Sequence, residues 1–205
     1  MKQYISISST PRYGVHVYAF DKLDGSNIRA EWSPKKSLWK FGSRKRLIGS
    51  DQDYLQDAEK LIREKYEEDL DKIFRKQRFQ KATAFFEFYG KSSFAGRHFD
   101  EPHNVTLIDV NPFKSGITNP DEFIDLYGHL GIPELVFKGN FNKEVEYQIR
   151  TQKLPYITLE GVVCKVKEQH KQKHPLMFKV KTFKWLKMLK KLCEENKDLN
   201  YEALV

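Results

Sequence analysis

Short segments rich in β-branched and aromatic residues recur along this 205-residue chain, with turn residues between them. Such runs are typical of β-strands, in which alternate side chains face opposite sides. Residues 13–32 predict two strands joined by a short loop at Asp24-Gly25, with Lys22 beside that loop. A strand at 37–48 would carry Arg44. Others are predicted at 83–89, at 104–110 and, as a pair, at 156–166 and 176–181.

Helical periodicity occupies the gaps between these segments. Apolar residues recur at spacings of three and four from Asp51 to Phe74. A second helix is predicted to begin at Asn119-Pro120 and to end at Gly131, and further helices cover 142–151 and 182–193. No repeat, low-complexity tract or linker divides the chain. We therefore expect one α+β domain over residues 1–205, built of antiparallel sheets flanked by helices.

The formal charge of +8 comes from 36 Lys and Arg against 28 Asp and Glu, and it suggests a nucleic acid or a nucleotide as partner. On charge alone, an ordinary basic protein remains the alternative. Cys164 and Cys193 form no CxxC pair, no apolar run is long enough to cross a membrane, and the first residues lack the order of a signal peptide. These features lead us to expect a reduced cytoplasmic protein without a membrane partner.

The sharpest local feature is Lys22, which precedes Leu23-Asp24-Gly25. A lysine is a nucleophile only when neutral, and with an ordinary pKa of about 10.4 roughly one molecule in a few thousand is neutral at pH 7. Neighbouring positive charge or desolvation must therefore depress its pKa. Lys179 and Lys181 alternate on a predicted strand, so both could face one phosphate. Taken alone, the motif also fits an exposed lysine before a turn.

Further motifs follow Lys22 in a fixed order. They are SR at 43–44, FEFYG at 86–90, EGVV at 160–163 and KVK at 179–181. This series resembles the collinear motifs of the covalent nucleotidyltransferases, which include ATP-dependent DNA ligases, RNA ligases and mRNA capping enzymes. The wording KLDGSN, FFEFYG and EGVVCK is most similar to the RNA ligases of the double-strand-sealing and RNA-editing branch. The resemblance covers about residues 18–185.

The resemblance implies a fold, an activity and partners. The fold would be the ATP-grasp-like ligase catalytic domain, with ATP in the cleft between the sheets. Lys22 would attack the α-phosphate of ATP and form lysyl-AMP, with Mg²⁺ or Mn²⁺ assisting. AMP would then pass to an RNA 5′-phosphate, and a 3′-hydroxyl would displace it to join two RNA ends or seal a nicked duplex.

It also implies site residues. Lys22 would be the catalytic nucleophile, supported by Asp24, Lys179 and Lys181, and Glu160 would hold the metal. The ATP-binding set would comprise Asp21, Lys22, Leu23, Asn27, Arg44, Glu87, Ile108, Lys165, Lys179 and Lys181. Within that set Asn27, Arg44 and Glu87 would contact the ribose or guide the RNA end, and the lysines would neutralise phosphates. Arg46 competes with Arg44 for the ribose. Ile108 stands where relatives often stack a phenylalanine on adenine.

Several alternatives stay open. A capping-type guanylyltransferase that uses GTP and a DNA ligase catalytic domain share the lysine chemistry, and a catalytically silent RNA-binding module is a third class. No C-terminal OB-fold domain is present, so RNA docking could come from a partner subunit. Trp185 and Leu189 predict a helix packed on the core, and most lysines between 165 and 191 fit a solvated face. His170 and His174 lack a third zinc ligand nearby.

Overall fold

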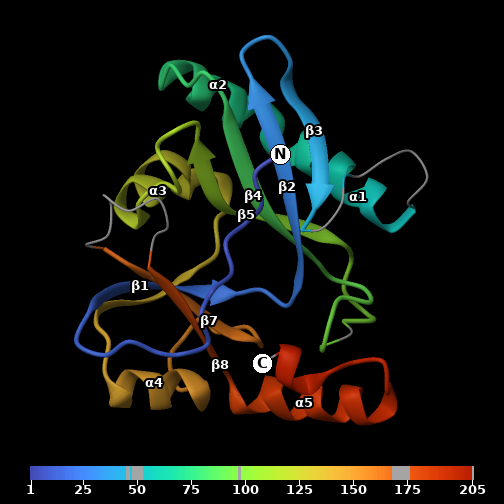
Figure 1. Ribbon diagram of the computed structural model, residues 1–205, viewed down its shortest axis with the longest axis vertical. Helices are drawn as coiled ribbons and strands as arrows, with labels where there is room; N and C mark the ends of the chain where they lie inside the picture. Colours follow the sequence, from blue (N-terminus) through green and yellow to red (C-terminus); the bar gives the residue numbers. More distant parts are fainter. Residues whose placement is uncertain (45–46, 48–52, 97, 168–175, 205) are drawn as a thin grey trace.

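Two four-stranded antiparallel sheets form the centre of the computed structural model (Figure 1), which describes residues 1–44, 47, 53–96, 98–167 and 176–204. The first sheet has the strand order β6-β1-β7-β8 and the second has the order β3-β2-β4-β5. In the first sheet the strands are β1 (His16–Lys22), β6 (Leu135–Asn140), β7 (Gly161–Val166) and β8 (Met177–Lys181). In the second they are β2 (Gly25–Ser33), β3 (Ser37–Ser43), β4 (Ala82–Tyr89) and β5 (Asn104–Pro112). The predicted α+β class with antiparallel sheets is confirmed.

The chain crosses from one sheet to the other at Leu23-Asp24. β1 pairs with β6 and β7, whereas β2 pairs with β3 and β4. The two strands around the short loop were predicted correctly, but they are not partners. At the crossing, a Cβ on Gly25 would lie 2.3 Å from the carbonyl oxygen of Phe88, so only glycine lets β2 start this close to β4. The crossing places Lys22 at the junction of the sheets.

Two strand boundaries near the site differ from the prediction, and one strand was missed. β3 ends at Ser43, so Arg44 lies just after the strand rather than on it. β7 begins at Gly161, which leaves Glu160 immediately before it. The edge strand β6 was not predicted at all, because its six residues include Gly139 and Asn140 and show little alternation of buried side chains.

Helices cover the outer faces of the sheets (Figure 1). α1 (Asp53–Ile62), a π-helical turn (Arg63–Glu67) and α2 (Glu68–Lys76) follow one another directly, as the periodicity predicted. Their buried residues share one core with the β2–β4–β5 strands and with α3 (Pro120–Tyr127), which a 3₁₀ turn (Gly128–Leu130) extends. Gly131 ends this segment with a left-handed backbone, as expected of a helix stop.

Two helices lie next to the first sheet, along the lower edge of Figure 1. α4 (Lys143–Arg150) packs Val145 and Ile149 into a core with β1, β7 and β8. α5 (Phe183–Glu195) buries Trp185 and Leu189, which confirms the prediction of a helix packed on the core, and α6 (Tyr201–Leu204) follows it. Among the described residues, no helix combines the length and apolarity needed to span a bilayer.

Candidate active site

A cavity of about 730 Å³ lies between the two sheets. The register of the first sheet explains its floor, because Lys22 is opposite Gly161, which is opposite Lys181. Two residues back along β1, the row is Phe20, Val163 and Lys179. Since side chains alternate across a strand, both rows face the same side of the sheet, and all but the glycine line the cavity. The predicted alternation of Lys179 and Lys181 is thus confirmed.

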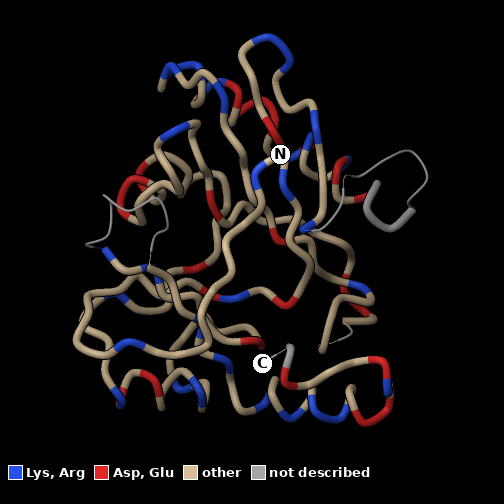
Figure 2. Tube along the Cα trace, in the orientation of Figure 1, with Lys and Arg blue, Asp and Glu red and all other residues tan. Residues whose placement is uncertain are grey.

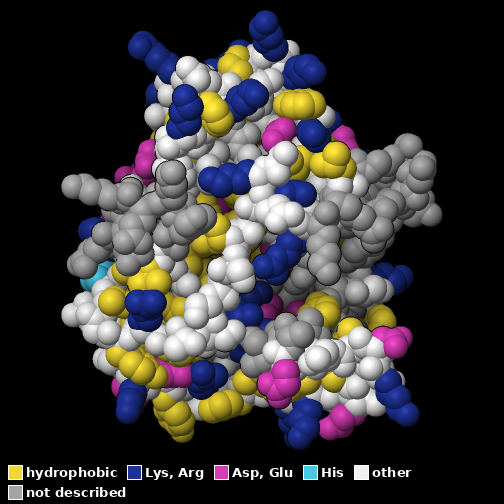
Figure 3. All heavy atoms as spheres, viewed as in Figure 1, with side chains coloured by type: hydrophobic (Ala, Val, Ile, Leu, Met, Phe, Trp, Pro, Cys, Tyr) yellow, Lys and Arg dark blue, Asp and Glu magenta, His cyan; other side chains and the backbone are white. Residues whose placement is uncertain are grey.

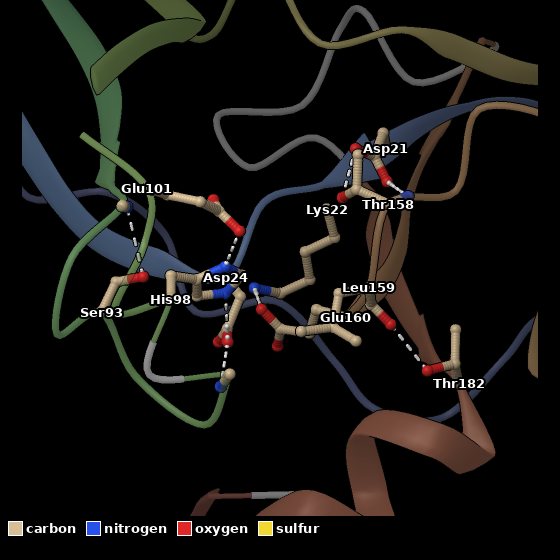
Figure 4. A network of polar contacts seen from close by, with 12 residues as sticks. Asp21, Lys22, Asp24, Ser93, His98, Glu101, Thr158, Leu159, Glu160 and Thr182 are labelled. Atoms are coloured by element: carbon tan, nitrogen blue, oxygen red, sulfur yellow. Dashed lines mark hydrogen bonds and ion pairs between the residues drawn. The ribbon is translucent and has the colours of Figure 1, made fainter. Parts of the chain in front are cut away.

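Lys22 and Glu160 form the central contact (Figure 4). The Lys22 ammonium is 2.6 Å from Glu160 Oε2, and the Lys181 ammonium is 3.5 Å from Glu160 Oε1. The carboxylate can reach both lysines because it stands just before β7, which lies between β1 and β8 in the sheet. Glu160 is buried, and the Lys22 side chain is 21% exposed. The Lys22 amine therefore stands at the floor of the cavity and remains open to it.

The opposite sheet contributes Asn27 and Glu87, which are cross-strand partners on β2 and β4 and both line the cavity. Burial raises the pKa of the Glu87 carboxyl to about 8, with Glu160 adding to the rise and Lys22 opposing it. Arg44 also lines the cavity, just beyond β3. Its competitor Arg46 falls outside the described residues, as do His170 and His174.

The expected depression of the Lys22 pKa is wrong in this structure. Burial acts to lower the pKa of this ammonium, but the carboxylates of Glu160 and Glu87 outweigh burial and raise it above the ordinary value. The physical reason is distance, because Glu160 bonds the ammonium directly. Sequence order showed the cationic neighbours but could not show that an anion lies closer.

The lowered values belong to the two neighbouring lysines. Burial lowers the pKa of Lys179, and the positive charge of Lys22 lowers it further. Burial also lowers the pKa of Lys181 to about 8, although Glu160 opposes the change. The Lys181 ammonium lies 4.0 Å from the centre of the Trp185 ring, which also lines the cavity. The cavity thus has a cationic end formed by Lys22, Lys179 and Lys181.

The lining of the cavity also includes apolar side chains, namely Phe20, Ile108, Pro133 and Val163. Lys165 lines the cavity too, but its ammonium bonds Asp109 at 2.6 Å and the carbonyl oxygen of Ile108 at 2.8 Å. In this structure it is therefore held by a carboxylate rather than free for a phosphate.

The N-terminal segment forms a wall that sequence reasoning missed. Tyr4, Ile5, Ser6 and Ile7 all line the cavity. Tyr4 donates a hydrogen bond to Asp109 of the second sheet, and the Lys179 amide of the first sheet donates to Ser8 at 2.8 Å. The segment therefore spans both sheets, and we call residues 4–8 the N-terminal strap. Its signal was the alternation of Ile5-Ser6-Ile7-Ser8, which predicts an extended strand.

Two expected site residues have their carboxylates engaged elsewhere. Asp24 accepts hydrogen bonds from the Gly96 amide at 2.6 Å and from His98 Nε2 at 3.3 Å, and it lines a second cavity of about 550 Å³ (Figure 4). Asp21 and Leu23 line the first cavity, but the Asp21 carboxylate accepts bonds from the amide and hydroxyl of Thr158. Both carboxylates therefore hold the segments around Lys22 in place.

The site offers carboxylate oxygens for a hard cation. Glu160 and Glu87 both line the cavity, and oxygen ligands suit Mg²⁺ or Mn²⁺. In the part of the chain that the structure describes, no group of three or more His, Cys, Asp or Glu could hold a metal by itself. The residues therefore fit a cation that completes its shell with water or with substrate phosphates.

Comparison with protein-family models and with curated proteins finds no match. Solved structures do match. A Naegleria gruberi RNA ligase variant with AMP and Mn is 14% identical, with a TM-score of 0.66 over 97% of this chain and 59% of that one. A variant of the same ligase with ATP and Mn has a TM-score of 0.62 and 14% identity over 91% and 53%. The ligase with PPi has a TM-score of 0.62 and 15% identity over 91% and 53%.

The chain shares the fold of these solved RNA ligases. At this identity the likeness establishes the fold alone, and the mixed architecture with two antiparallel sheets agrees with it. The chain spans between 53% and 59% of the length of these solved ligases.

Proposed function

We propose that the chain is an ATP-dependent RNA ligase that works through a lysyl-AMP intermediate. The Lys22 amine attacks the α-phosphorus of ATP, a P–N bond forms and pyrophosphate leaves. An RNA 5′-phosphate oxygen then attacks the same phosphorus and releases the amine. Finally a 3′-hydroxyl attacks the RNA phosphate, and AMP leaves as the phosphodiester forms.

The observation that carries this proposal is the cluster in which Glu160 contacts both Lys22 and Lys181 in one cavity that Lys179 also lines. Such a cluster places a nucleophilic amine within reach of a phosphate that two other ammonium groups can neutralise. The apolar lining residues, Phe20 among them, suit a purine. Structural neighbours determined with ATP, AMP and PPi support the same assignment.

The Lys22 proton must leave before attack. When Glu160 turns from the lysine to another partner, the contact that holds the proton is lost, while the ammonium groups of Lys179 and Lys181 remain and favour the neutral amine. A divalent cation held by Glu160 and Glu87 would supply Lewis-acid stabilisation of phosphate charge. Asn27 and Arg44 then face the sugar or the RNA end from the second sheet.

Finer features of the proposal come from the motif wording. It favours the branch that seals nicks in duplexes and edits RNA. We further propose that residues 1–205 form the adenylyltransferase domain, that a partner subunit can supply RNA docking, and that the protein works in the cytoplasm. Both cysteines are free, in agreement with a reducing compartment.

Labelling with ATP tests the covalent step. Incubation with [α-³²P]ATP and Mg²⁺, followed by denaturing electrophoresis, should label the wild-type chain, and Lys22→Ala should reduce the label at least a thousandfold because no other amine occupies its place. Lys76→Ala, at an exposed position of α2, is the matched control and should label normally. Label retained in Lys22→Ala would refute the proposal. So would an unlabelled wild-type chain in both Mg²⁺ and Mn²⁺.

Three assays separate the alternatives: labelling with GTP, joining of nicked DNA, and RNA binding. Labelling by GTP in preference to ATP would favour a capping-type guanylyltransferase. Efficient joining of nicked DNA but not of RNA ends would favour a DNA ligase. Salt-sensitive RNA binding without any nucleotide adduct would favour a silent RNA-binding module.

A further inference from the structure

A surface on α4 and the start of α5 combines exposed aromatic rings with cations. Tyr147 and Phe183 are 50% and 52% exposed. The Lys153 ammonium lies 5.1 Å from the Tyr147 ring centre, and the Arg150 guanidinium lies 5.9 Å from that of Phe183. Figure 2 shows basic residues along this lower edge, with acidic residues among them, and Figure 3 shows hydrophobic side chains between the charged ones. We define the α4–α5 face as Tyr147, Arg150, Lys153, Phe183, Lys184 and Lys187.

The lysines of α5 belong to this face because the helix is amphipathic. Trp185 and Leu189 are buried on one side of α5, while Lys184 and Lys187 are exposed and three residues apart on another. The packed side fixes the helix, so the exposed lysines project from a rigid support rather than from a loop. A solvated face was expected here, and the structure adds the two aromatic rings beside it.

The α4–α5 face is directly joined to the nucleotide cavity. Lys181 and Trp185 line the cavity, and Phe183, halfway between them in the chain, faces solvent. Arg150 Nη1 donates to the Lys181 carbonyl oxygen at 3.3 Å, which ties the end of α4 to the end of β8. One short segment thus presents cavity residues on one side and the face on the other.

The chemistry of the face fits a single-stranded polynucleotide. Aromatic rings stack on unpaired bases, and interspersed Lys and Arg neutralise the phosphates between those bases. Glu146, the acidic side chain nearest Arg150, is already bound to it at 2.7 Å. A purely apolar partner would leave the ammonium groups of Lys153, Lys184 and Lys187 unneutralised.

We propose that the α4–α5 face binds a single-stranded stretch of the RNA whose end occupies the cavity, with Tyr147 and Phe183 stacking on bases and Lys184 and Lys187 contacting phosphates. This inference rests on the proposed function, which it extends by naming how the RNA is held.

RNA affinity of the full chain tests the proposal. A 20-nucleotide single-stranded RNA with a 5′-phosphate is titrated by fluorescence anisotropy at several salt concentrations. The double variant Tyr147→Ala/Phe183→Ala should bind at least tenfold more weakly, with little change in salt dependence. Lys184→Gln/Lys187→Gln should lower the slope of log affinity against log salt by about 0.7 for each lost phosphate contact.

The chain contains a matched control. Phe113 is 52% exposed, and the Lys114 ammonium lies 5.3 Å from its ring centre, but the pair follows β5 and does not line the nucleotide cavity. Phe113→Ala/Lys114→Gln should bind RNA as the wild type does. Lys22 labelling by ATP reports in each variant that the domain is folded.

Three results would overturn the inference. The first is wild-type RNA affinity in Tyr147→Ala/Phe183→Ala, and the second is an equal loss of affinity in the control variant. The third is a changed sedimentation coefficient of the aromatic variant with unchanged RNA affinity, which would make the face a contact between copies of the chain. Absence of ATP labelling in the wild type would instead refute the proposed function, and weaker RNA binding by the face variants would still be measurable.

Discussion

At the scale of single residues, charge balance inside the cavity decides the resting state. Lys22 is held protonated by Glu160, whereas Lys181 and Lys179 have lowered pKa values because they are partly desolvated beside another ammonium. The difference follows from one 2.6 Å contact. In the proposed mechanism, Lys22 therefore rests protonated, and an anion bound in the cavity would favour the charged forms of Lys179 and Lys181.

Glu87 makes stability depend on pH. Its carboxyl has a pKa of about 8 in the folded chain, against about 4.3 when unfolded. Above pH 4.3 the unfolded chain releases this proton while the folded chain keeps it up to about pH 8, so Glu87 lowers stability as pH rises through that window. Glu87→Gln, which cannot ionise, should be more stable than the wild type at pH 8.5 and nearly equal at pH 4.

Urea unfolding in EDTA at both pH values measures this difference. Glu134→Gln, at an exposed position, is the control and should change stability little at either pH. A gain for Glu87→Gln that is the same at both pH values would show that its ionisation is not the cause.

At the scale of elements, the connection between β4 and β5 secures the turn that follows Lys22. The Asp24 carboxylate accepts hydrogen bonds from the Gly96 amide and from His98 Nε2, and His98 Nδ1 lies 2.7 Å from the Glu101 carboxylate (Figure 4). A Cβ on Gly96 would lie 2.3 Å from His98 Nε2, so a glycine lets the imidazole approach this closely. The turn is thus fixed by residues more than 70 positions away in sequence.

His98 should strengthen this connection only while it is charged. Burial acts to lower the pKa of its imidazole, but hydrogen bonds to Glu101 and Asp24 outweigh it and raise the pKa. The contribution is then fully present below the ordinary pKa of about 6.5 and is lost as pH rises through the higher folded value. His98→Gln should therefore cost more stability at pH 5.5 than at pH 9, as measured by urea unfolding. A loss that does not change with pH would contradict this account.

At the scale of the whole molecule, the two sheets are linked by the β1–β2 crossing and by the N-terminal strap. The strap contacts Asp109 in one sheet and Lys179 in the other, and four of its residues line the cavity. A ligand between the sheets would therefore touch the strap as well as both sheets.

Hydrogen exchange should reveal this coupling. We expect ATP to slow amide exchange at least several-fold in residues 4–8 and in 160–165 together, because both segments line the cavity. Residues 113–115, outside the cavity, should exchange unchanged. Protection of 160–165 without protection of 4–8 would show that the strap is not part of the nucleotide site.

Local sequence was enough for most of the elements and for several of the residues that line the cavity. Alternation and helical spacing depend on neighbours along the chain, so β4, β5, α3 and α4 could be predicted, and the ordered motifs indicated Lys22, Glu160, Lys179 and Lys181. Local patterns do not report which strands pair. The separation of β1 and β2 into different sheets and the strap across the cavity therefore appeared only in the tertiary structure.

The charge state of Lys22 is also a feature that only the tertiary structure decides. Its sequence neighbours and the later motifs supplied the reacting groups, but a pKa depends on distances and burial in three dimensions. Folding placed an anion nearer to Lys22 than the cations and turned Asp24 towards His98. Sequence alone determined which groups the chain brings to this chemistry, and only the tertiary structure decided which of them touch, because contacts between distant segments set the local field.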